Sequence, residues 1–217
     1  MTRVLFICTG NTCRSPMAEA LLEHKKTADE IVADSAGLHG VEGMPMSEGT
    51  RRVLQTRGMM ESHQSRVLDE GQLRSADLVL TMTEQHKRAL IEHYPEAVEK
   101  VYTLKEYTAD HSEMTQKMDQ IKQEEAEMDL KRSEILHANE RNVRAYNKDG
   151  EISGQQELEE ELLHAMMPYQ SNIDKLKWDM PSLDIADPFG GGDEEYEAAY
   201  EEINHAVERL LEKIERD

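Results

Sequence analysis

A cysteine and an arginine, six positions apart, stand between a short apolar run and a predicted helix. Residues 4–7 are apolar and indicate a buried strand that leads into Cys8, and after a loop of small polar residues Arg14 and Ser15 precede Pro16, which opens the helix. A tight loop at a helix N-terminus directs backbone N–H groups to one point, where the helix dipole adds partial positive charge. The loop is therefore predicted to bind a dianion the size of phosphate.

The side chains of this loop suit nucleophilic attack on phosphorus. The loop N–H groups and the charge of Arg14 favour the thiolate form of Cys8, the predicted nucleophile. The planar fork of Arg14 can bind two phosphoryl oxygens and follow them into the transition state. The alternative is that Cys8 is a buried structural residue that merely follows a strand. The succession of strand, loop, Arg-Ser-Pro and helix disfavours this alternative. The other predicted phosphate-binding residues of the loop are Thr9, Gly10, Asn11, Thr12, Cys13 and Ser15, the last also placed to bond the Cys8 sulfur.

The chain of 217 residues has a formal net charge of −20, which bears on its partners. Such an acidic surface repels nucleic acid and anionic membranes, so neither is expected to bind. The sequence has no apolar run of membrane-spanning length and no secretory signal pattern, so we expect a cytoplasmic protein. The nine histidines show no metal-binding spacing, and neither a metal nor another cofactor is expected.

Both cysteines of the chain, Cys8 and Cys13, lie in the same loop. This placement makes a framework of structural disulfides implausible. A reversible bond between the two sulfurs under oxidation is one interpretation, because a thiolate beside a second thiol can be trapped as a disulfide. Simple packing of Cys13 is the other, and the sequence leaves both open.

Short apolar runs alternate with amphipathic segments over most of the chain. Strands are predicted at residues 4–8, 31–33, 78–82 and 98–104, with a turn at 35–37, and helices at 16–26, 47–57, 83–93 and 193–216. This alternation predicts an α/β fold, a four-stranded parallel sheet with helices on both faces. Ligands of such sheets bind beyond the carboxyl ends of the strands, which is where Cys8 stands.

Residues 108–180 differ in character from the rest, being rich in charge with apolar residues at helical spacing. They are predicted to form an inserted α-helical hairpin with a first arm at 112–145 and a second arm bent or broken at Pro168. Asn147–Gly150 and Gly154 interrupt the pattern between the arms. The apolar stripes are expected to cover each other; a face for a helical partner or for self-association through residues 108–180 is the less favoured interpretation.

The sequence CTGNTCRSPMAE at residues 8–19 resembles the phosphate-binding loop of the low-molecular-weight protein tyrosine phosphatase family. Residues 34–37, 62–66, 76–82 and 187–191 also match that family, so the resemblance covers 1–107 and 181–217 as the phosphatase domain and leaves 108–180 as an insertion. It implies a cysteine-dependent phosphatase acting on phosphorylated proteins. It also implies that Asp187 is the general acid and that Phe189 forms a wall of the substrate pocket.

Thr12 departs from the aliphatic residue, often isoleucine, that tyrosine-specific members commonly carry at this position. Together with the sequence DPFGG at residues 187–191, it resembles the protein arginine phosphatase branch. The resemblance implies hydrolysis of phosphoarginine in proteins through a phosphocysteine at Cys8. A protein tyrosine phosphatase remains the nearest alternative, and a non-enzymatic adaptor with a helical arm is a further one. Thiol-coupled arsenate reductase is disfavoured because it needs another cysteine.

Overall fold

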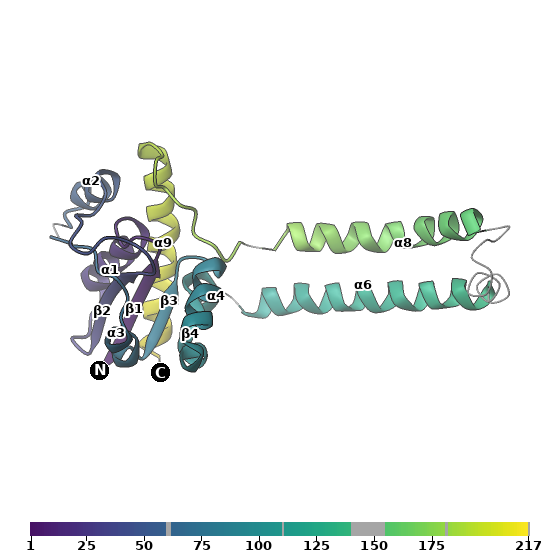
Figure 1. Cartoon of the computed structure of the whole chain (residues 1–217), viewed down its shortest axis with the longest axis horizontal. Helices are drawn as coiled ribbons and strands as arrows, with labels where there is room; N and C mark the ends of the chain where they lie inside the picture. Colours follow the sequence, from purple (N-terminus) through teal and green to yellow (C-terminus); the bar gives the residue numbers. More distant parts are fainter. Residues whose placement is uncertain (60–61, 110, 140–154, 181, 217) are drawn as a thin grey trace. The chain divides into compact units, whose positions relative to one another are not determined.

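The computed structural model describes residues 1–59, 62–109, 111–139, 155–180 and 182–216. Contacts divide the chain into two compact units, Met1–Ala109 with Ser182–Asp217, and Asp110–Pro181 (Figure 1). The sequence places the corresponding boundaries at 107/108 and 180/181. No helix among the described residues has both the length and the apolar character needed to cross a membrane.

The first unit is built on a four-stranded parallel sheet, as the sequence predicts. Its strands are β1 (Thr2–Cys8), β2 (Ile31–Gly37), β3 (Leu78–Thr81) and β4 (Val101–Thr103), in the order β2-β1-β3-β4. Cys8 pairs with Gly37 and Ile7 pairs with Thr81. The register therefore brings the ends of the three neighbouring strands together around Cys8.

Side chains of β1 alternate between two cores, because successive residues of a strand point to opposite faces. Val4 and Phe6 belong to one core, and Leu5 and Ile7 to the other. The first core contains residues of α1 (Arg14–Lys25), α2 (Glu48–Thr56), α5 (Leu104–Thr108) and α9 (Asp193–Ile214), and the second contains residues of α3 (Glu70–Ser75), α4 (Glu84–His93) and the 3₁₀ helix η1 (Pro95–Lys100). Helices thus cover both faces, as predicted.

Two local predictions need correction, and two short helices were missed. Residues 35–37, expected to form a turn, continue β2 as far as Gly37. The fourth strand is shorter than predicted because η1 occupies 95–100. The short helices α3 and α5 were not predicted, although each begins with a capping box, formed by Asp69 with Gln72 and by Thr103 with Glu106. These elements are too short for apolar periodicity to reveal them.

The second unit contains the helices α6 (His111–Ala138) and α8 (Gln155–Trp178). Three bonds between them, Lys117 Nζ to Asp179 O, Asn172 Nδ2 to Glu124 and Asn139 Nδ2 to Glu161, show that the helices run antiparallel. The second arm was predicted to be bent or broken at Pro168; helix α8 is continuous through this residue, so a break is wrong. The last part of the predicted first arm, Asn147–Gly150 and Gly154 lie outside the described residues.

Candidate active site

The loop between β1 and α1 places the Cys8 sulfur among hydrogen-bond donors. Cys8 Sγ lies 3.0 Å from Ser15 Oγ and accepts a 3.3 Å hydrogen bond from the backbone N–H of Asn11. No side chain in the described part of the chain caps the N-terminus of α1, which begins at Arg14. Its first N–H groups are therefore available to an anion beside Cys8.

Asn11 holds the loop in its curved shape. It is fully buried and has a positive φ of 55°, a conformation that asparagine tolerates better than most residues. Its Nδ2 donates to Ser15 Oγ at 2.9 Å and to Ser35 Oγ at 2.7 Å, and its Oδ1 accepts from the backbone N–H of Arg66 at 2.8 Å. Its carbonyl oxygen accepts from His63 Nε2 at 2.8 Å. The loop is thus shaped by bonds that need no ligand.

The end of β2 approaches the loop so closely that it requires a glycine. A Cβ atom at Gly37 would lie 2.8 Å from the carbonyl oxygen of Thr9 and 3.0 Å from the nitrogen of Asn11. The next two residues bond to the same loop, with Leu38 N donating to Cys8 O at 3.0 Å and His39 N donating to Thr9 O at 2.8 Å. The backbone on this side of the loop is therefore fixed by β2.

Arg14 joins the loop to the segment that carries Asp187. Its guanidinium donates to the carbonyl oxygen of Ile185 at 3.0 Å and to Asp187 Oδ2 at 2.7 Å. The Arg14 side chain is 5% exposed, whereas that of Asp187 is 50% exposed. Arg14 Nε is buried and has no hydrogen-bond partner among the residues that the structure describes. A buried donor without a partner is costly, so this nitrogen is well placed to receive an acceptor from a ligand.

A cleft of about 210 Å³ gathers the predicted site residues. Its lining is Cys8, Thr9, Gly10, Thr12, Cys13, Arg14, Asp187 and Phe189. Asn11 and Ser15 are the two predicted residues that do not line it, because they are buried behind the loop. Phe189 is 75% exposed and forms the outer part of the wall. Within the described ranges, no group of three or more His, Cys, Asp or Glu side chains is placed to hold a metal ion.

Two residues that sequence reasoning did not connect with the site hold the far side of the loop. Ser47, at the start of the helix predicted at 47–57, donates its backbone N–H to Thr12 O at 2.8 Å, and its hydroxyl accepts from Cys13 Sγ at 3.3 Å. The hydroxyl of Tyr196 on α9 lies 3.8 Å from the same sulfur, and burial raises the pKa of Tyr196. No local sequence pattern links positions so far apart.

His86 in the first turn of α4 is a buried titratable group beside the cleft. Burial, helped by the positive charges of Arg14 and His39, lowers its pKa from 6.5 to about 4. The carboxylates of Asp187 and Asp184 oppose the shift without cancelling it. His86 is therefore a neutral imidazole at neutral pH.

This burial of His86 predicts a loss of stability in acid. Between pH 6.5 and about 4 the unfolded chain binds a proton at His86 that the folded chain does not, so folding is weakened as the pH falls through this range. The difference in pKa corresponds to at most about 3 kcal/mol. Urea unfolding at pH 7.5 and 4.5 should show a larger fall in unfolding free energy for the wild type than for His86→Gln. Equal falls in the unfolding free energy of the wild type and of His86→Gln would contradict the lowered pKa of His86.

Comparisons with known proteins bear on the family and the fold of the chain. The sequence profile of the family described as "Low molecular weight phosphotyrosine protein phosphatase" matches residues 3–149. A protein-arginine-phosphatase of Geobacillus stearothermophilus is 30% identical over 215 residues, which cover 99% of this chain and 97% of that protein. The low molecular weight protein-tyrosine-phosphatase PtpB of Staphylococcus haemolyticus is 37% identical over 108 residues, which cover 50% of this chain and 75% of that protein.

The fold is shared with a solved structure. The structure of the YwlE arginine phosphatase from Geobacillus stearothermophilus has a TM-score of 0.64 and 30% sequence identity, and the match covers 100% of this chain and 94% of that one. Both the profile and the full-length similarity are sufficient to assign the family. The chain belongs to the low molecular weight phosphotyrosine protein phosphatase family.

Proposed function

We propose that this phosphatase hydrolyses phosphoarginine in proteins through a phosphocysteine intermediate at Cys8. The observation that carries the proposal is the single cleft in which Cys8, Arg14 and Asp187 meet, with Thr12 on its wall. The similar Geobacillus protein is named a protein-arginine-phosphatase, which supports the choice of substrate.

The first chemical step forms a sulfur–phosphorus bond and breaks the phosphorus–nitrogen bond. The Cys8 thiolate attacks phosphorus, while Arg14 and the loop N–H groups bind the phosphoryl oxygens. A protonated Asp187 donates its proton to the departing guanidine nitrogen, which would otherwise be a poor leaving group. Asp187 Oδ2 lies 2.7 Å from the Arg14 guanidinium, so its carboxyl group is beside the phosphate position, and a bound phosphate would compete with Asp187 for the guanidinium.

The second step returns the enzyme to its starting state. Asp187, now a carboxylate, removes a proton from water as the water attacks the phosphocysteine. The sulfur–phosphorus bond breaks and Cys8 leaves as a thiolate. Ser15, whose Oγ lies 3.0 Å from Cys8 Sγ, donates a hydrogen bond to the departing sulfur and stabilises its charge.

We assign the choice of leaving group to Thr12. Its carbonyl accepts from the Ser47 N–H at 2.8 Å, which fixes the backbone, and its side chain lines the cleft. A threonine hydroxyl can contact the flat guanidinium and position water, while its branched Cβ crowds a phenyl ring. An aliphatic residue here would remove the polar contact and leave an apolar wall better suited to tyrosine.

The test is the ratio of kcat/KM on phosphoarginine to kcat/KM on phosphotyrosine. We expect the wild type to favour phosphoarginine and Thr12→Ile to lower the ratio about tenfold or more, since the lost contact serves one leaving group only. Cys8→Ser provides the blank. A wild-type preference for phosphotyrosine would retain the mechanism and overturn the substrate, in favour of a tyrosine phosphatase as the family name and the Staphylococcus relative suggest. Activity no higher than the blank on both substrates would favour an adaptor.

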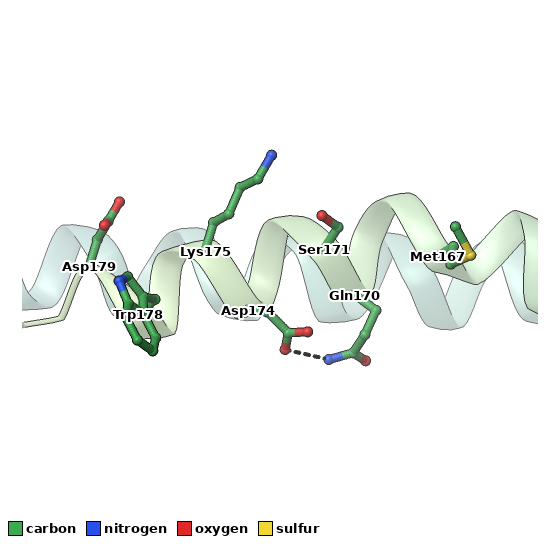
Figure 2. Close-up of a pocket in the computed structure, with 7 residues that line it drawn as sticks. All are labelled: Met167, Gln170, Ser171, Asp174, Lys175, Trp178 and Asp179. Atoms are coloured by element: carbon green, nitrogen blue, oxygen red, sulfur yellow. Dashed lines mark hydrogen bonds between the residues drawn. The ribbon is translucent and has the colours of Figure 1, made fainter.

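We further propose that residues 108–180 help to select phosphorylated protein substrates. Leu163, Met167 and Trp178 are exposed on α8, and Trp178 is 89% exposed. Figure 2 shows Met167 and Trp178 along one side of this helix, with the polar side chains of Gln170, Ser171 and Asp174 between them. Large apolar side chains left in water are typical of surfaces that contact other proteins.

A surface variant tests this second proposal in the full-length chain. Trp178→Ser should raise KM several-fold for an arginine-phosphorylated protein and leave turnover of free phosphoarginine unchanged. Leu130→Ser on α6, which removes another exposed apolar side chain, serves as the matched control. Equal effects on both substrates, or none, would contradict selection by this face. Loss of a dimer in Trp178→Ser, measured by sedimentation, would instead support self-association.

A further inference from the structure

A chain of polar contacts runs from helix α4 to the wall of the cleft. His86 Nδ1 lies 2.9 Å from Thr83 Oγ1, and His86 Nε2 lies 2.8 Å from Thr9 Oγ1. His86 is 8% exposed, whereas Thr9 lines the cleft together with Cys8 and Asp187. His86 thus connects the interior to the Thr9 side chain at the cleft, and the mechanism above does not use it.

The contact with His86 fixes the direction of the Thr9 hydroxyl, which the backbone contacts of Thr9 leave free. The Thr9 carbonyl accepts from His39 N at 2.8 Å and lies against Gly37. What remains is rotation about the first side-chain bond, which decides where the hydroxyl points. The bond to His86 selects one of these positions.

The hydrogen atoms shared in these two contacts follow from the tautomer of the His86 ring. Thr83 Oγ1 caps α4 by accepting from the backbone N–H of His86 at 3.2 Å, so it already acts as an acceptor there. We assign the His86 ring proton to Nδ1, from which it is donated to the same oxygen. Nε2 then accepts the hydroxyl proton of Thr9. In this arrangement the free lone pairs of Thr9 Oγ1 are hydrogen-bond acceptors.

We propose that His86 is a positioning residue that holds Thr9 Oγ1 as an acceptor for the guanidinium N–H groups of the leaving arginine. The inference rests on the proposed function and deepens it. A guanidinium presents several N–H donors, whereas the phenyl ring of phosphotyrosine presents none to this oxygen. Thr9 and His86 therefore add to Thr12 as determinants of the leaving group.

The neutral state of His86 is needed for this role. A protonated imidazole has no acceptor nitrogen and would add positive charge near both Arg14 and a cationic leaving group. The groups whose charges act on His86 are Arg14, Asp187, Asp184 and His39. Burial has a larger effect than any of these charges. The pKa of His86 is lowered to about 4, so the acceptor form persists at neutral pH.

The test compares kcat and KM of four variants on phosphoarginine and phosphotyrosine. Thr9→Val keeps the shape of the side chain without the hydroxyl, and His86→Leu removes the ring nitrogens. Each should lower kcat/KM for phosphoarginine about tenfold and for phosphotyrosine less than about twofold, as expected for one lost polar contact. His86→Gln, whose amide oxygen can accept from Thr9, should restore most of the loss. His93→Leu, the same substitution at an exposed position of α4, is the matched control.

The double variant Thr9→Val with His86→Leu distinguishes a shared role from two separate ones. If both changes remove the same contact, kcat/KM of the double variant for phosphoarginine is no lower than that of the less active single variant. Additive losses in the double variant, or equal losses on the two substrates, would overturn the proposal. If His86→Leu does not fold, the ratio of kcat/KM on the two substrates for Thr9→Val still tests it. A wild type that prefers phosphotyrosine would overturn the proposed substrate first, so the two failures are distinguishable.

Discussion

Cys8→Ser is expected to lose at least about 10⁴-fold in kcat on every substrate, because the hydroxyl is a far weaker nucleophile than the thiolate it replaces. The substitution changes one atom in a buried position whose neighbours, Ser15 Oγ and the Asn11 N–H, can bond oxygen as well as sulfur. The fold and the affinity for inorganic phosphate should therefore persist. Stopped-flow turnover and phosphate titration would measure the two properties.

Cys13→Ser is the matched control, since it makes the same change in the same loop. Its sulfur faces Ser47 and Tyr196, so we expect a loss within about tenfold. Mass spectrometry of enzyme quenched during turnover should find phosphate on Cys8 and none on Cys13. Phosphate trapped on any other residue, or turnover by Cys8→Ser near that of the wild type, would contradict the proposed nucleophile.

Asp187→Asn should lower kcat on phosphoarginine by about 10²–10⁴-fold, the usual contribution of a positioned general acid. The asparagine amide has one acceptor oxygen, which can keep the bond from Arg14, while the 3.2 Å bond from the backbone N–H of Phe189 to Asp187 Oδ1 is given up, so most of the loop geometry should be retained. The loss that matters to the reaction is the proton. The loss should therefore be much smaller on p-nitrophenyl phosphate, whose leaving group departs readily as an anion.

Asp184→Asn in the same segment separates this effect from a general disturbance. Asp184 Oδ1 accepts from the backbone N–H of Glu84 at 2.7 Å, a bond that asparagine can also make. We expect near-normal kinetics for this variant in a steady-state assay on both compounds. An equal loss for Asp187→Asn on the two compounds would argue that Asp187 orients Arg14 and does not transfer a proton.

The parts of the fold that could be predicted are those encoded by adjacent residues. The run from Val4 to Cys8 is apolar because β1 is an inner strand buried on both faces, and α1 starts at Arg14, close to the proline that suggested it. The sheet and its flanking helices follow from the alternation of such segments. The short helices and the true ends of β2 and β4 depend on tertiary contacts, which a local pattern does not contain.

The support of the loop could not be predicted for the same reason. Asn11 bonds to Ser35 and to the backbone of Arg66, which is 55 positions away, and Thr9 bonds to His86, which is 77 positions away. No local pattern in the sequence pairs Arg66 or His86 with the loop. Only the parallel register, which places the ends of β1, β2 and β3 side by side, turns them into neighbours.

The attachment of residues 184–185 has a consequence for how the chain tolerates additions. Immediately after the second unit ends, Asp184 accepts from Glu84 N at 2.7 Å and from Lys105 Nζ at 3.1 Å, and Ile185 N donates to Met82 O at 2.8 Å. These bonds set the position of Asp187 from within the first unit. The stretch 110–181 could therefore lengthen, shorten or be exchanged during evolution without moving Asp187, the proposed general acid, and a reporter domain could be grafted between Ala109 and Ser182 on the same principle.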